Sequence, residues 1–599
     1  MYRDQAESVR EFKRWEENTA GNAEISQALA DIKNNPEKIM EAFYMNMSFG
    51  TGGLRGYLGA GTNRMNVYTV SKASFGLAHY IIKKYDREKR AISIGYDSRI
   101  NSKIFAETAA RIFASLGIRT YIFSELSPTP LLSWAVRWLN CSAGIMITAS
   151  HNPAEYNGYK VYASDGCQIT TQAAREILAE IEAVDYFENI LLTDLQEGLR
   201  SGIISYIDDS VITAYIEKVK EQSLFSDDRK EINQKLSIVY TPLNGTGLKP
   251  VLRTLNECGF KNITVVEEQR LPDGHFPTCP RPNPELKEAM DLGIEYAQNI
   301  NADILLATDP DCDRVGIVIR DSTGRYIQLS ANETGTLLLD FICTQRKAKQ
   351  SLPANPVFIK TVVTTGLAEQ IAKSNGLKTI NVPTGFKFIG EQIGLLEKAN
   401  RKEDFIFAFE ESYGYLSGTY VRDKDGVVAA MLICEMAAYY KKSGKCLLDI
   451  LEIIYQKYGF YMDTLHTYQF EGIEGKNHMD YIMKRLRELV NELLKEGKNG
   501  SVCEKTVMIG NKKVSSIVDY LSGITYYADG HTESIVDIPK NNMLILRLEG
   551  ECSIVVRPSG TEPKLKVYAS VKAKDRRQAE RVEKEVLDSF SQYIHMQGE

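Results

Sequence analysis

One serine and a group of three aspartates are the residues whose types and spacing best suit catalysis and metal binding. Ser150 lies in the segment 144–153, where a short apolar run leads into a polar turn. The apolar run predicts a buried strand, and Asn152 followed by Pro153 predicts a turn directly after the serine. The hydroxyl should therefore lie at the end of a sheet, where it can meet a ligand. The segment lacks the Gly-x-Ser-x-Gly pattern of acyl hydrolases, so acyl transfer is disfavoured.

Three aspartates, Asp309, Asp311 and Asp313, follow the apolar run 302–307 at alternate positions. At roughly 4–5 Å and an effective dielectric of about 20, each pair of carboxylates costs about 3–4 kcal/mol, which a bound cation would remove. The loop is not an EF-hand, because Arg314 and Arg320 replace the required glycine and glutamate. Oxygen ligands without histidine or cysteine favour Mg²⁺. The alternative, a solvated acidic turn, explains this combination of residues poorly.

Four further loops could bind an anion or a sugar. The segment 557–561 offers an arginine, two hydroxyls and a glycine, which suits a phosphate group, although a plain hairpin turn would have the same residues. The segment 410–414 has carboxylates and a hydroxyl that could hold sugar hydroxyls, and 383–387 adds a polar loop. The glycine-rich segment 49–56 fails both nucleotide fingerprints, yet its arginine could contact phosphate. Together these loops indicate a phosphorylated sugar, a divalent metal and a serine that accepts the phosphoryl group.

Short apolar runs that alternate with helical segments would position these loops. The runs are residues 91–96, 144–148, 236–240, 302–307, 357–363 and 405–409. Such alternation predicts largely parallel sheets with helices on both faces. Polar loops follow several of the runs, at 97–99, 148–153, 241–247, 308–314 and 410–414. Open α/β sheets bind ligands beyond the carboxyl ends of their strands, so the chemistry is expected there.

The 599 residues are too many for one hydrophobic core. We predict four domains: 1–205 with a helical extension and the serine loop, 206–325 with the metal loop, 326–460 with the sugar loop, and 461–599 with a connector and the phosphate loop. The extension should bury Phe12, Trp15, Ile25, Leu29 and Ile32. The segment 466–513, with a charged helix at about 479–496, resembles a connector. The rest of the last domain reads as α+β, with strands at 543–549, 552–556 and 565–571 and a final helix.

Composition narrows the class of protein. The net charge of −6 gives no global basic field, which argues against a nucleic-acid partner. The N-terminus does not resemble a signal peptide, and no apolar run is long enough to span a bilayer. The run 427–440 contains Glu435 and is expected to be a buried helix. The ten cysteines form no CxxC pair and read as reduced thiols of a cytoplasmic protein.

The segments 148–153, 309–314, 383–387, 410–412 and 557–561 occur in the order seen in the α-D-phosphohexomutases, and 49–55 resembles the opening motif of that family. The resemblance runs from about residue 40 to the end of the chain and is strongest to the long phosphoglucomutases, including the branch that shades into phosphopentomutases. It implies an α/β architecture of four domains around a central cleft. Three similar mixed α/β sheet domains would precede a smaller C-terminal α+β phosphate-binding domain.

The reaction implied by the resemblance interconverts glucose 1-phosphate and glucose 6-phosphate. Phosphorylated Ser150 would give its phosphoryl group to the substrate, and the resulting glucose 1,6-bisphosphate, also an activator, would turn round and return the other phosphate. Ser150, Asp309, Asp311 and Asp313 are the implied ligands of Mg²⁺. The implied substrate-binding residues are Arg55, Arg314, Thr384, Gly385, Glu410, Ser412, Lys424, Arg557, Ser559, Gly560 and Thr561.

Lys160, Lys424 and His151 are the candidates for proton transfer. Many relatives have a histidine after the Glu-x-Ser motif, where this chain has Tyr413, whereas Lys424 matches a lysine of the longer phosphoglucomutases. A lysine can act near neutral pH only if burial or nearby cations lower its pKa. The alternative role of either lysine is a phosphate contact. For His151, donation of a hydrogen bond to the phosphoserine is favoured over catalysis.

Other functions fit the same residues. A phosphopentomutase, a phosphomannomutase or a glucose 1,6-bisphosphate synthase would differ only in the loops that hold the sugar. A metal-dependent phosphatase would lose the phosphoryl group to water, and a non-catalytic sugar-phosphate sensor would keep the pocket without turnover. The partners expected in each case are small sugar phosphates, with the chain acting as a monomer or a homodimer.

Overall fold

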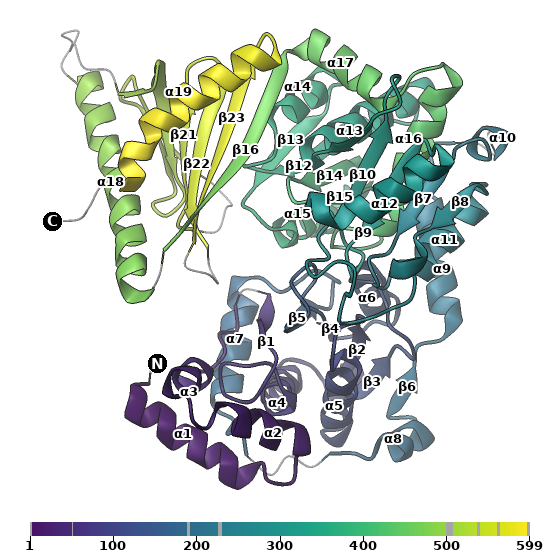
Figure 1. Ribbon diagram of the computed structural model, residues 1–599, viewed down its shortest axis with the longest axis vertical. Helices are drawn as coiled ribbons and strands as arrows, with labels where there is room; N and C mark the ends of the chain where they lie inside the picture. Colours follow the sequence, from purple (N-terminus) through teal and green to yellow (C-terminus); the bar gives the residue numbers. More distant parts are fainter. Residues whose placement is uncertain are drawn as a thin grey trace. The chain divides into compact units, whose positions relative to one another are not determined.

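The computed structural model of the chain describes residues 3–50, 52–187, 192–225, 230–470, 472–498, 507–535, 540–559 and 564–595 (Figure 1). The chain divides into two compact units. Unit 1 comprises Met1–Ala331 and Phe386–Cys446, and unit 2 comprises Asn332–Gly385 and Leu447–Glu599. The third of the four domains expected from the sequence is therefore divided between the two units.

Unit 1 begins with three helices, α1 (Gln5–Asn18), α2 (Ala23–Ile32) and α3 (Pro36–Phe43), as the sequence predicts. Asp4 and Glu7 form a capping box at the start of α1, which satisfies backbone donors that the helix leaves unpaired. The Trp15 ring lies 5.4 Å from Tyr68 and 5.6 Å from Tyr186, so it fixes the helices to the sheet domain that follows. Four of the five expected core residues are buried, namely Phe12, Trp15, Ile25 and Leu29. The fifth, Ile32, is partly buried.

The first sheet of unit 1 has six strands in the order β1-β5-β4-β2-β3-β6. They are β1 (Gly53–Tyr57), β2 (Ala91–Tyr96), β3 (Arg119–Ile122), β4 (Ala143–Ile147), β5 (Tyr156–Ala163) and β6 (Ile204–Tyr206). β4, β2, β3 and β6 are parallel to one another, whereas β5 pairs antiparallel with both β4 and β1. The sheet is thus mixed, because the tight turn after Ser150 sends the chain straight back beside β4.

Helices cover both faces of this sheet (Figure 1). They are α4 (Val67–Lys84), α5 (Ser102–Ser115), α6 (Thr129–Trp138), α7 (Thr171–Glu182) and α8 (Leu195–Ser201). α4 packs against α5 and α7. On the opposite face α6 comes so close that a Cβ added at Gly144 would lie 2.3 Å from Val136 Cγ2, so β4 needs a glycine there.

The second sheet of unit 1 repeats this plan with the order β11-β10-β9-β7-β8. Its strands are β7 (Ile238–Thr241), β8 (Ile263–Val265), β9 (Ile304–Thr308), β10 (Val315–Arg320) and β11 (Tyr326–Leu329). The accompanying helices are α9 (Asp209–Lys220), α10 (Lys230–Asn233), α11 (Leu248–Glu257) and α12 (Lys287–Ile300). β9 pairs parallel with β7 and antiparallel with β10. The aspartate loop and the serine loop therefore occupy the same kind of place, a tight turn between a parallel strand and its antiparallel neighbour.

The remainder of unit 1 contains α15 (Phe386–Lys398), a hairpin of β14 (Phe405–Glu410) and β15 (Gly414–Leu416), and α16 (Gly426–Lys442). α16 is buried on all sides over 426–438. Its one charged residue in that stretch, Glu435, accepts a hydrogen bond from the backbone N of Leu224 at 2.9 Å and another from the Ser223 hydroxyl. The expectation of a buried helix at 427–440 is confirmed.

Removal of the Asp425 carboxylate should destabilise unit 1 by about 2–4 kcal/mol. Asp425 caps α16 by accepting two backbone N–H groups at 2.8 and 3.2 Å, and it also accepts the hydroxyls of Tyr215 at 2.9 Å and Tyr420 at 2.6 Å. In Asp425→Ala those buried donors lose their acceptor. Asp208→Ala, which removes the exposed cap of α9, should cost only about 1 kcal/mol. Urea unfolding midpoints of the two variants measure the difference, and equal midpoints would contradict it.

Unit 2 contains α13 from Asn332 onward (Ala331–Ala348), β12 (Val357–Thr361), α14 (Gly366–Ser374), β13 (Lys378–Val382) and α17 (Leu447–Tyr458), with β12 and β13 parallel. An antiparallel sheet follows in the order β16-β23-β22-β21-β18-β19-β20, with β17 beside β18. Its strands are β16 (Phe460–Gln469), β17 (Met508–Ile509), β18 (Lys512–Asp519), β19 (Ile524–Tyr527), β20 (Thr532–Ser534), β21 (Leu544–Leu548), β22 (Cys552–Pro558) and β23 (Lys564–Ala573).

Two helices, α18 (Gly472–Lys498) and α19 (Arg576–His595), pack on one face of this sheet (Figure 1). The predicted inner face of the last helix is confirmed, since Ala579, Val582, Val586 and Phe590 are all buried. The expectation of a connector at 466–513 is wrong. β16 pairs with β23 over its full length, and α18 contributes several core residues: Met479, Ile482, Met483, Leu486, Leu489 and Leu493.

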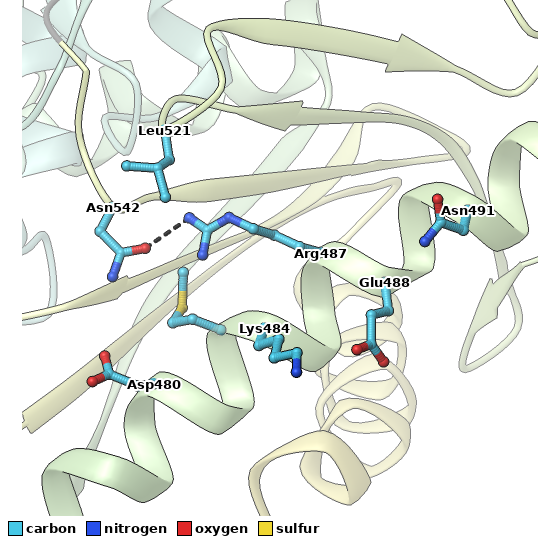
Figure 2. Close-up of a pocket in the computed structure, with 8 residues that line it drawn as sticks. Asp480, Lys484, Arg487, Glu488, Asn491, Leu521 and Asn542 are labelled. Carbon is cyan, nitrogen blue, oxygen red and sulfur yellow. Dashed lines mark hydrogen bonds between the residues drawn. The ribbon is translucent and has the colours of Figure 1, made fainter.

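A pocket of about 460 Å³ lies beside α18 (Figure 2). Figure 2 shows Arg487 reaching from α18 toward Asn542, whose Oδ1 accepts its hydrogen bond at 2.7 Å. Arg487 Nε also lies 3.3 Å from Asp519 Oδ1. Because Arg487 is already paired with Asn542 and Asp519, its role is structural: it holds α18 against the sheet. Among the described helices of the chain, none is both long and apolar enough to cross a membrane.

Candidate active site

Ser150 lies at the carboxyl end of β4 and is 3% exposed. Its Oγ donates a hydrogen bond to Asp309 Oδ2 at 2.9 Å and lies 3.2 Å from His151 Nδ1. The serine loop of the first sheet and the aspartate loop of the second sheet therefore meet within unit 1. This contact joins the two segments that the sequence singles out, although they are 159 residues apart.

Both loops contain a residue with a left-handed backbone. φ is 54° at Ser150 and 52° at Cys312. Residues other than glycine adopt this conformation at a cost, and it persists only where the surroundings enforce it. The backbone N of Ser150 donates to Thr148 Oγ1 at 2.8 Å, and a Cβ added at Gly426 would lie 2.6 Å from the Cys312 carbonyl oxygen. Close packing thus holds both turns in the conformation that brings their side chains together.

The three aspartates form a buried cluster that fits a metal ion. Asp309 Oδ1 accepts the backbone N–H groups of Asp313 and Arg314, each at 3.0 Å, which fixes the loop. One ligand oxygen from each carboxylate lies within 4.8 Å of the other two. Among the described residues, Asp311 Oδ1 and Asp313 Oδ1 are buried without a hydrogen-bond partner. Buried carboxylate oxygens without donors are costly, so a hard divalent cation would satisfy them.

The aspartates of the cluster differ in how readily they ionise. Burial, together with Asp313 and Asp311, raises the pKa of Asp309 well above its usual value. Burial also opposes ionisation of Asp311, yet Lys160 and Lys424 outweigh it and lower the pKa of Asp311. Thr129 Oγ1 donates to Asp311 Oδ2 at 2.8 Å and supports the charged form. A bound cation would favour the ionised form of all three carboxylates.

Lys160 and Lys424 both reach the aspartates. Lys160 Nζ lies 2.7 Å from Asp311 Oδ2, and Lys424 Nζ lies 3.0 Å from Asp313 Oδ2. Burial alone would lower the pKa of each amine, but Asp311 and Asp313 outweigh it for Lys160, and Asp313 and Asp423 for Lys424, so both pKa values are raised. The lowered pKa that the sequence analysis required of a lysine base is therefore not found. Both amines are held in the charged form, which suits phosphate binding or proton donation.

His151, Arg55 and Arg314 surround the serine. Burial, together with Arg314 and Arg55, lowers the pKa of His151 well below its usual value, so the imidazole is neutral. A neutral imidazole 3.2 Å from the hydroxyl suits a hydrogen bond better than a charge contact. Arg55 Nη1 donates to Asn152 Oδ1 at 3.1 Å at the edge of the serine loop. Arg314 Nη1 lies 2.5 Å from Glu285 Oε1, and its Nε lies 3.9 Å from Asp309 Oδ2.

Glu410 and Ser412 lie in the β14–β15 hairpin, which adjoins the aspartate loop. The backbone N of Val315, the first residue of β10, donates to the Tyr413 carbonyl at 3.1 Å. Burial raises the pKa of Glu410 to about 7, while Lys424 opposes this shift. The Ser412 side chain hydrogen-bonds to Glu410. A carboxyl that is half protonated near neutral pH can donate to or accept from a sugar hydroxyl.

The remaining predicted residues belong to unit 2. Gly385 has a φ of 113°, which only glycine adopts readily. Thr384 Oγ1 and Arg557 Nε are buried without a hydrogen-bond partner among the described residues, as expected of donors that await a ligand. The backbone N of Ser559 donates to the Lys564 carbonyl at 2.7 Å and closes the β22–β23 turn. Gly560 and Thr561 lie outside the described residues.

Sequence reasoning missed two residues that support this site. Thr129, at the start of α6, bonds Asp311 through both its hydroxyl and its backbone N, the latter at 2.9 Å. Arg99 is buried below the serine loop and donates to its backbone carbonyls. The sequence offered one signal for Arg99, since residues 97–99 form a polar loop directly after β2. Thr129 gave no signal, because a threonine beside a proline reads only as a helix start.

Comparison with protein families accounts for most of the chain. Models of the phosphoglucomutase/phosphomannomutase family match residues 46–188 as α/β/α domain I, 213–324 as α/β/α domain II, 331–458 as α/β/α domain III and 540–589 as the C-terminal domain. The chain belongs to this family. All four family domains are present and in order, so the predicted fold class is confirmed. The expected family, which rested on six short motifs, is confirmed as well.

Individual relatives agree with the family match. A Staphylococcus aureus (strain MRSA252) protein named phosphoglucomutase is 37% identical over 536 residues, which cover 89% of this chain and 91% of the relative. The phosphoglucomutase of Staphylococcus aureus (strain USA300) is 37% identical over 533 residues. The prediction of an enzyme of the phosphoglucomutase type is confirmed by these relatives.

Solved structures support the fold. The open form of the exocytosis-sensitive phosphoprotein pp63/parafusin, a phosphoglucomutase from Paramecium, has a TM-score of 0.64 at 18% identity and covers 92% of this chain and 96% of its own. A phosphoglucomutase/phosphomannomutase family protein from Burkholderia thailandensis has a TM-score of 0.61 at 15% identity, with coverage of 92% and 98%. At these identities the likeness concerns the fold alone.

Proposed function

We propose that the chain interconverts glucose 1-phosphate and glucose 6-phosphate, with Ser150 as the carrier of the phosphoryl group, Mg²⁺ as the metal and glucose 1,6-bisphosphate as intermediate and activator. The observation that carries this proposal is the 2.9 Å contact between Ser150 Oγ and Asp309 Oδ2. A phosphoryl group on Ser150 would adjoin the two unpaired oxygens of Asp311 and Asp313. That arrangement suits a cation shared by carboxylates and phosphate.

The metal would be held by Asp309, Asp311, Asp313 and an oxygen of the phosphoserine. When bound, it neutralises charge on the transferring phosphoryl group. Lys160, Lys424 and Arg314 surround the same place, and their fixed charges would stabilise the equatorial oxygens. Thr129 and the backbone of Arg314 hold the carboxylates in position, so little reorganisation is needed when charge develops.

The transfer step exchanges one ester bond for another. A hydroxyl oxygen of the sugar bonds to phosphorus as the bond between phosphorus and Ser150 Oγ breaks. The proton of the sugar hydroxyl is replaced by one on Ser150 Oγ, so the step leaves the number of protons unchanged. Lys160 and Lys424 are our candidates for this exchange, because a charged amine beside the aspartate loop can give a proton to Ser150 Oγ and take up the proton of the sugar hydroxyl. The bisphosphate then reorients, and the reverse step returns its other phosphate to Ser150.

Restricted access for water favours a mutase over a phosphatase. Ser150 is 3% exposed, and its hydroxyl is enclosed by Asp309 and His151. A hydrolase must place water in line with the phosphorus atom, whereas a mutase benefits from excluding water. We therefore expect phosphate release to be far slower than isomerisation.

The test combines mass spectrometry with kinetics. The purified protein should carry about one phosphate on the peptide that contains Ser150. kcat/KM should be highest for glucose 1-phosphate when glucose, mannose and ribose 1-phosphates are compared with Mg²⁺ and the bisphosphate present. A preference for mannose or ribose 1-phosphate would replace the sugar assignment. Free phosphate release as fast as isomerisation would identify a phosphatase, and no turnover of any substrate would identify a sensor.

Arg557→Ala should raise KM for glucose 1-phosphate about 10- to 100-fold and change kcat less. The proposed role of Arg557, with Ser559, Gly560 and Thr561, is to bind the phosphate that is not reacting. The unpaired Nε of Arg557 supports this role. Arg547→Ala, which removes an exposed arginine from the neighbouring strand β21, is the control and should leave KM unchanged. Steady-state kinetics decide, and equal KM values for the two variants would refute the assignment.

We also propose a cytoplasmic enzyme that acts as a monomer or homodimer without a nucleic-acid partner. The net charge of −6 offers no basic field for nucleic acid. None of the nine cysteines in the described part of the chain forms a disulfide, which suits a reducing compartment.

A further inference from the structure

Arg99 donates hydrogen bonds to four backbone carbonyls of the serine loop. Its Nη1 donates to Pro153 O at 2.7 Å and to Tyr156 O at 3.0 Å. Its Nη2 donates to Ser150 O at 2.5 Å and to Asn152 O. The guanidinium therefore holds the loop from Ser150 to the start of β5 as one rigid turn.

Asp97 completes this network from the other side. Its Oδ1 accepts the backbone N of Arg99 at 3.0 Å, and its Oδ2 lies 3.4 Å from Arg99 Nε. Thr148 Oγ1 donates to Asp97 Oδ2 at 2.5 Å and accepts the backbone N of Ser150 at 2.8 Å. Ser150 is thus bound through its N–H by way of Thr148 and through its C=O by Arg99. The buried ion pair of Asp97 and Arg99 therefore fixes the backbone of Ser150, which has a left-handed conformation, at both its N–H and its C=O.

The same guanidinium also contacts the sheet domain that carries the aspartates. Its Cζ lies 5.1 Å from the centre of the Phe276 ring, which belongs to the segment between β8 and α12. Phe276 is fully buried, and a Cβ added at nearby Gly274 would lie 2.6 Å from Ile100 N. The loop of Arg99 is therefore packed tightly against the second sheet domain within unit 1. A shift of this loop would therefore change the distance between Ser150 Oγ and Asp309 Oδ2.

We propose that Arg99 is a positioning residue for phosphoryl transfer, which sets the place of Ser150 Oγ relative to the aspartates through the backbone of the serine loop. The inference rests on the proposed function, since it concerns the phosphoserine form. The Arg99 side chain is buried and bonds the backbone of the serine loop, so it would act through Ser150 and not by contact with the sugar phosphate. A planar guanidinium can serve four carbonyls in a fixed geometry, whereas the three donors of a lysine cannot. Misplacement of a reacting group by about 1 Å can cost about a hundredfold in rate.

The test replaces Arg99 by lysine, by methionine and by alanine and compares each variant with the same change at Arg90. Arg90 is a matched control, because it lies in the same domain and donates to the backbone carbonyls of Tyr85 and Ile82, both at 2.9 Å, without contact to the serine loop. Thermal unfolding first establishes that each variant is folded. If Arg99→Met does not fold, Arg99→Lys carries the test.

Three measurements separate positioning from a general loss of structure. For Arg99→Lys we expect kcat to fall about 100-fold, with KM for glucose 1-phosphate within about twofold of the original value. Single-turnover transfer from the purified phosphoenzyme to glucose 1-phosphate should fall by the same factor as kcat. Arg90→Lys should leave all three unchanged. Added methylguanidine should restore part of the transfer rate to Arg99→Ala and none to Arg90→Ala.

The outcomes distinguish the two proposals. If the unaltered protein has phosphoserine and mutase activity while folded Arg99→Lys transfers phosphate as fast as Arg90→Lys, the positioning role is wrong and the proposed function stands. A rise in KM with unchanged kcat would also overturn the positioning role, because it would indicate a binding contact. If the unaltered protein neither carries phosphate on Ser150 nor isomerises the sugar phosphate, the proposed function itself has failed.

Discussion

Ser150→Ala should lower mutase turnover by at least about 10⁴-fold, the largest effect expected of any single substitution in unit 1. The variant has no oxygen at position 150 to carry the phosphoryl group, and the hydroxyl of Thr148 in the same loop is held by its hydrogen bonds to Asp97 and to the backbone N of residue 150. The fold should survive, because the loop is held by its backbone contacts to Thr148 and Arg99 and not by the hydroxyl. Loss of the bond to Asp309 should cost about 1 kcal/mol.

Ser142→Ala is the matched control for this prediction. Ser142 precedes β4 as Ser150 follows it, is also buried, and donates through Oγ to a single backbone carbonyl, that of Lys89, at 2.6 Å. Both variants should lose a similar amount of thermal stability, but only Ser150→Ala should lose turnover and the phosphorylated peptide. Turnover of Ser150→Ala within about tenfold of the control would exclude the carrier role.

The places of the catalytic loops could be predicted from the sequence because strand ends are marked locally. The apolar run 91–96 coincides with β2, and the run 302–307 leads into the aspartate loop as expected. A buried strand of an α/β sheet is continuously apolar, and the polar residues after it can only stand at its carboxyl end. The contact of Ser150 with Asp309 then follows if the carboxyl ends of β4 and β9 face each other. The motifs shared with the family imply that they do.

Pairing partners and buried charges could not be predicted in the same way. Residues 156–163 mix aromatic, polar and small side chains with one glycine, and nothing in the local sequence indicates that they return antiparallel beside β4. α18 was expected to be a connector because one of its faces is strongly charged, yet its opposite face fills the core of unit 2. Arg99 is the clearest case. A buried arginine needs a counter-charge and several acceptors, here Asp97 and the carbonyls of the serine loop, and their convergence is a property of the folded chain.

Asp311→Asn should weaken binding of Mg²⁺ at least about 100-fold and lower turnover by about 10³-fold. The amide keeps the shape of the carboxylate and its contact to Thr129 but removes one of three charges from the cluster. Lys160 bonds the same oxygen as Thr129, so an amide oxygen in that place still accepts from the amine but gives it no counter-charge. Removal of metal by a chelator should lower the turnover of the unaltered protein by a similar factor, and readdition of Mg²⁺ should restore that turnover.

Thermal unfolding provides a measure of metal binding that does not depend on turnover. A ligand that binds only the folded protein stabilises it by about 2.7 kcal/mol at a hundred times its Kd, so Mg²⁺ should raise the unfolding temperature of the unaltered protein. Asp311→Asn should lose that rise. Asp303→Asn should keep it, since Asp303 lies in the same sheet domain outside the cluster and accepts from Ser237 N at 2.8 Å and Lys441 Nζ at 2.5 Å. Equal metal-dependent shifts in both variants would mean that the cation binds elsewhere, because the unpaired oxygens of the cluster would then have no part in holding it.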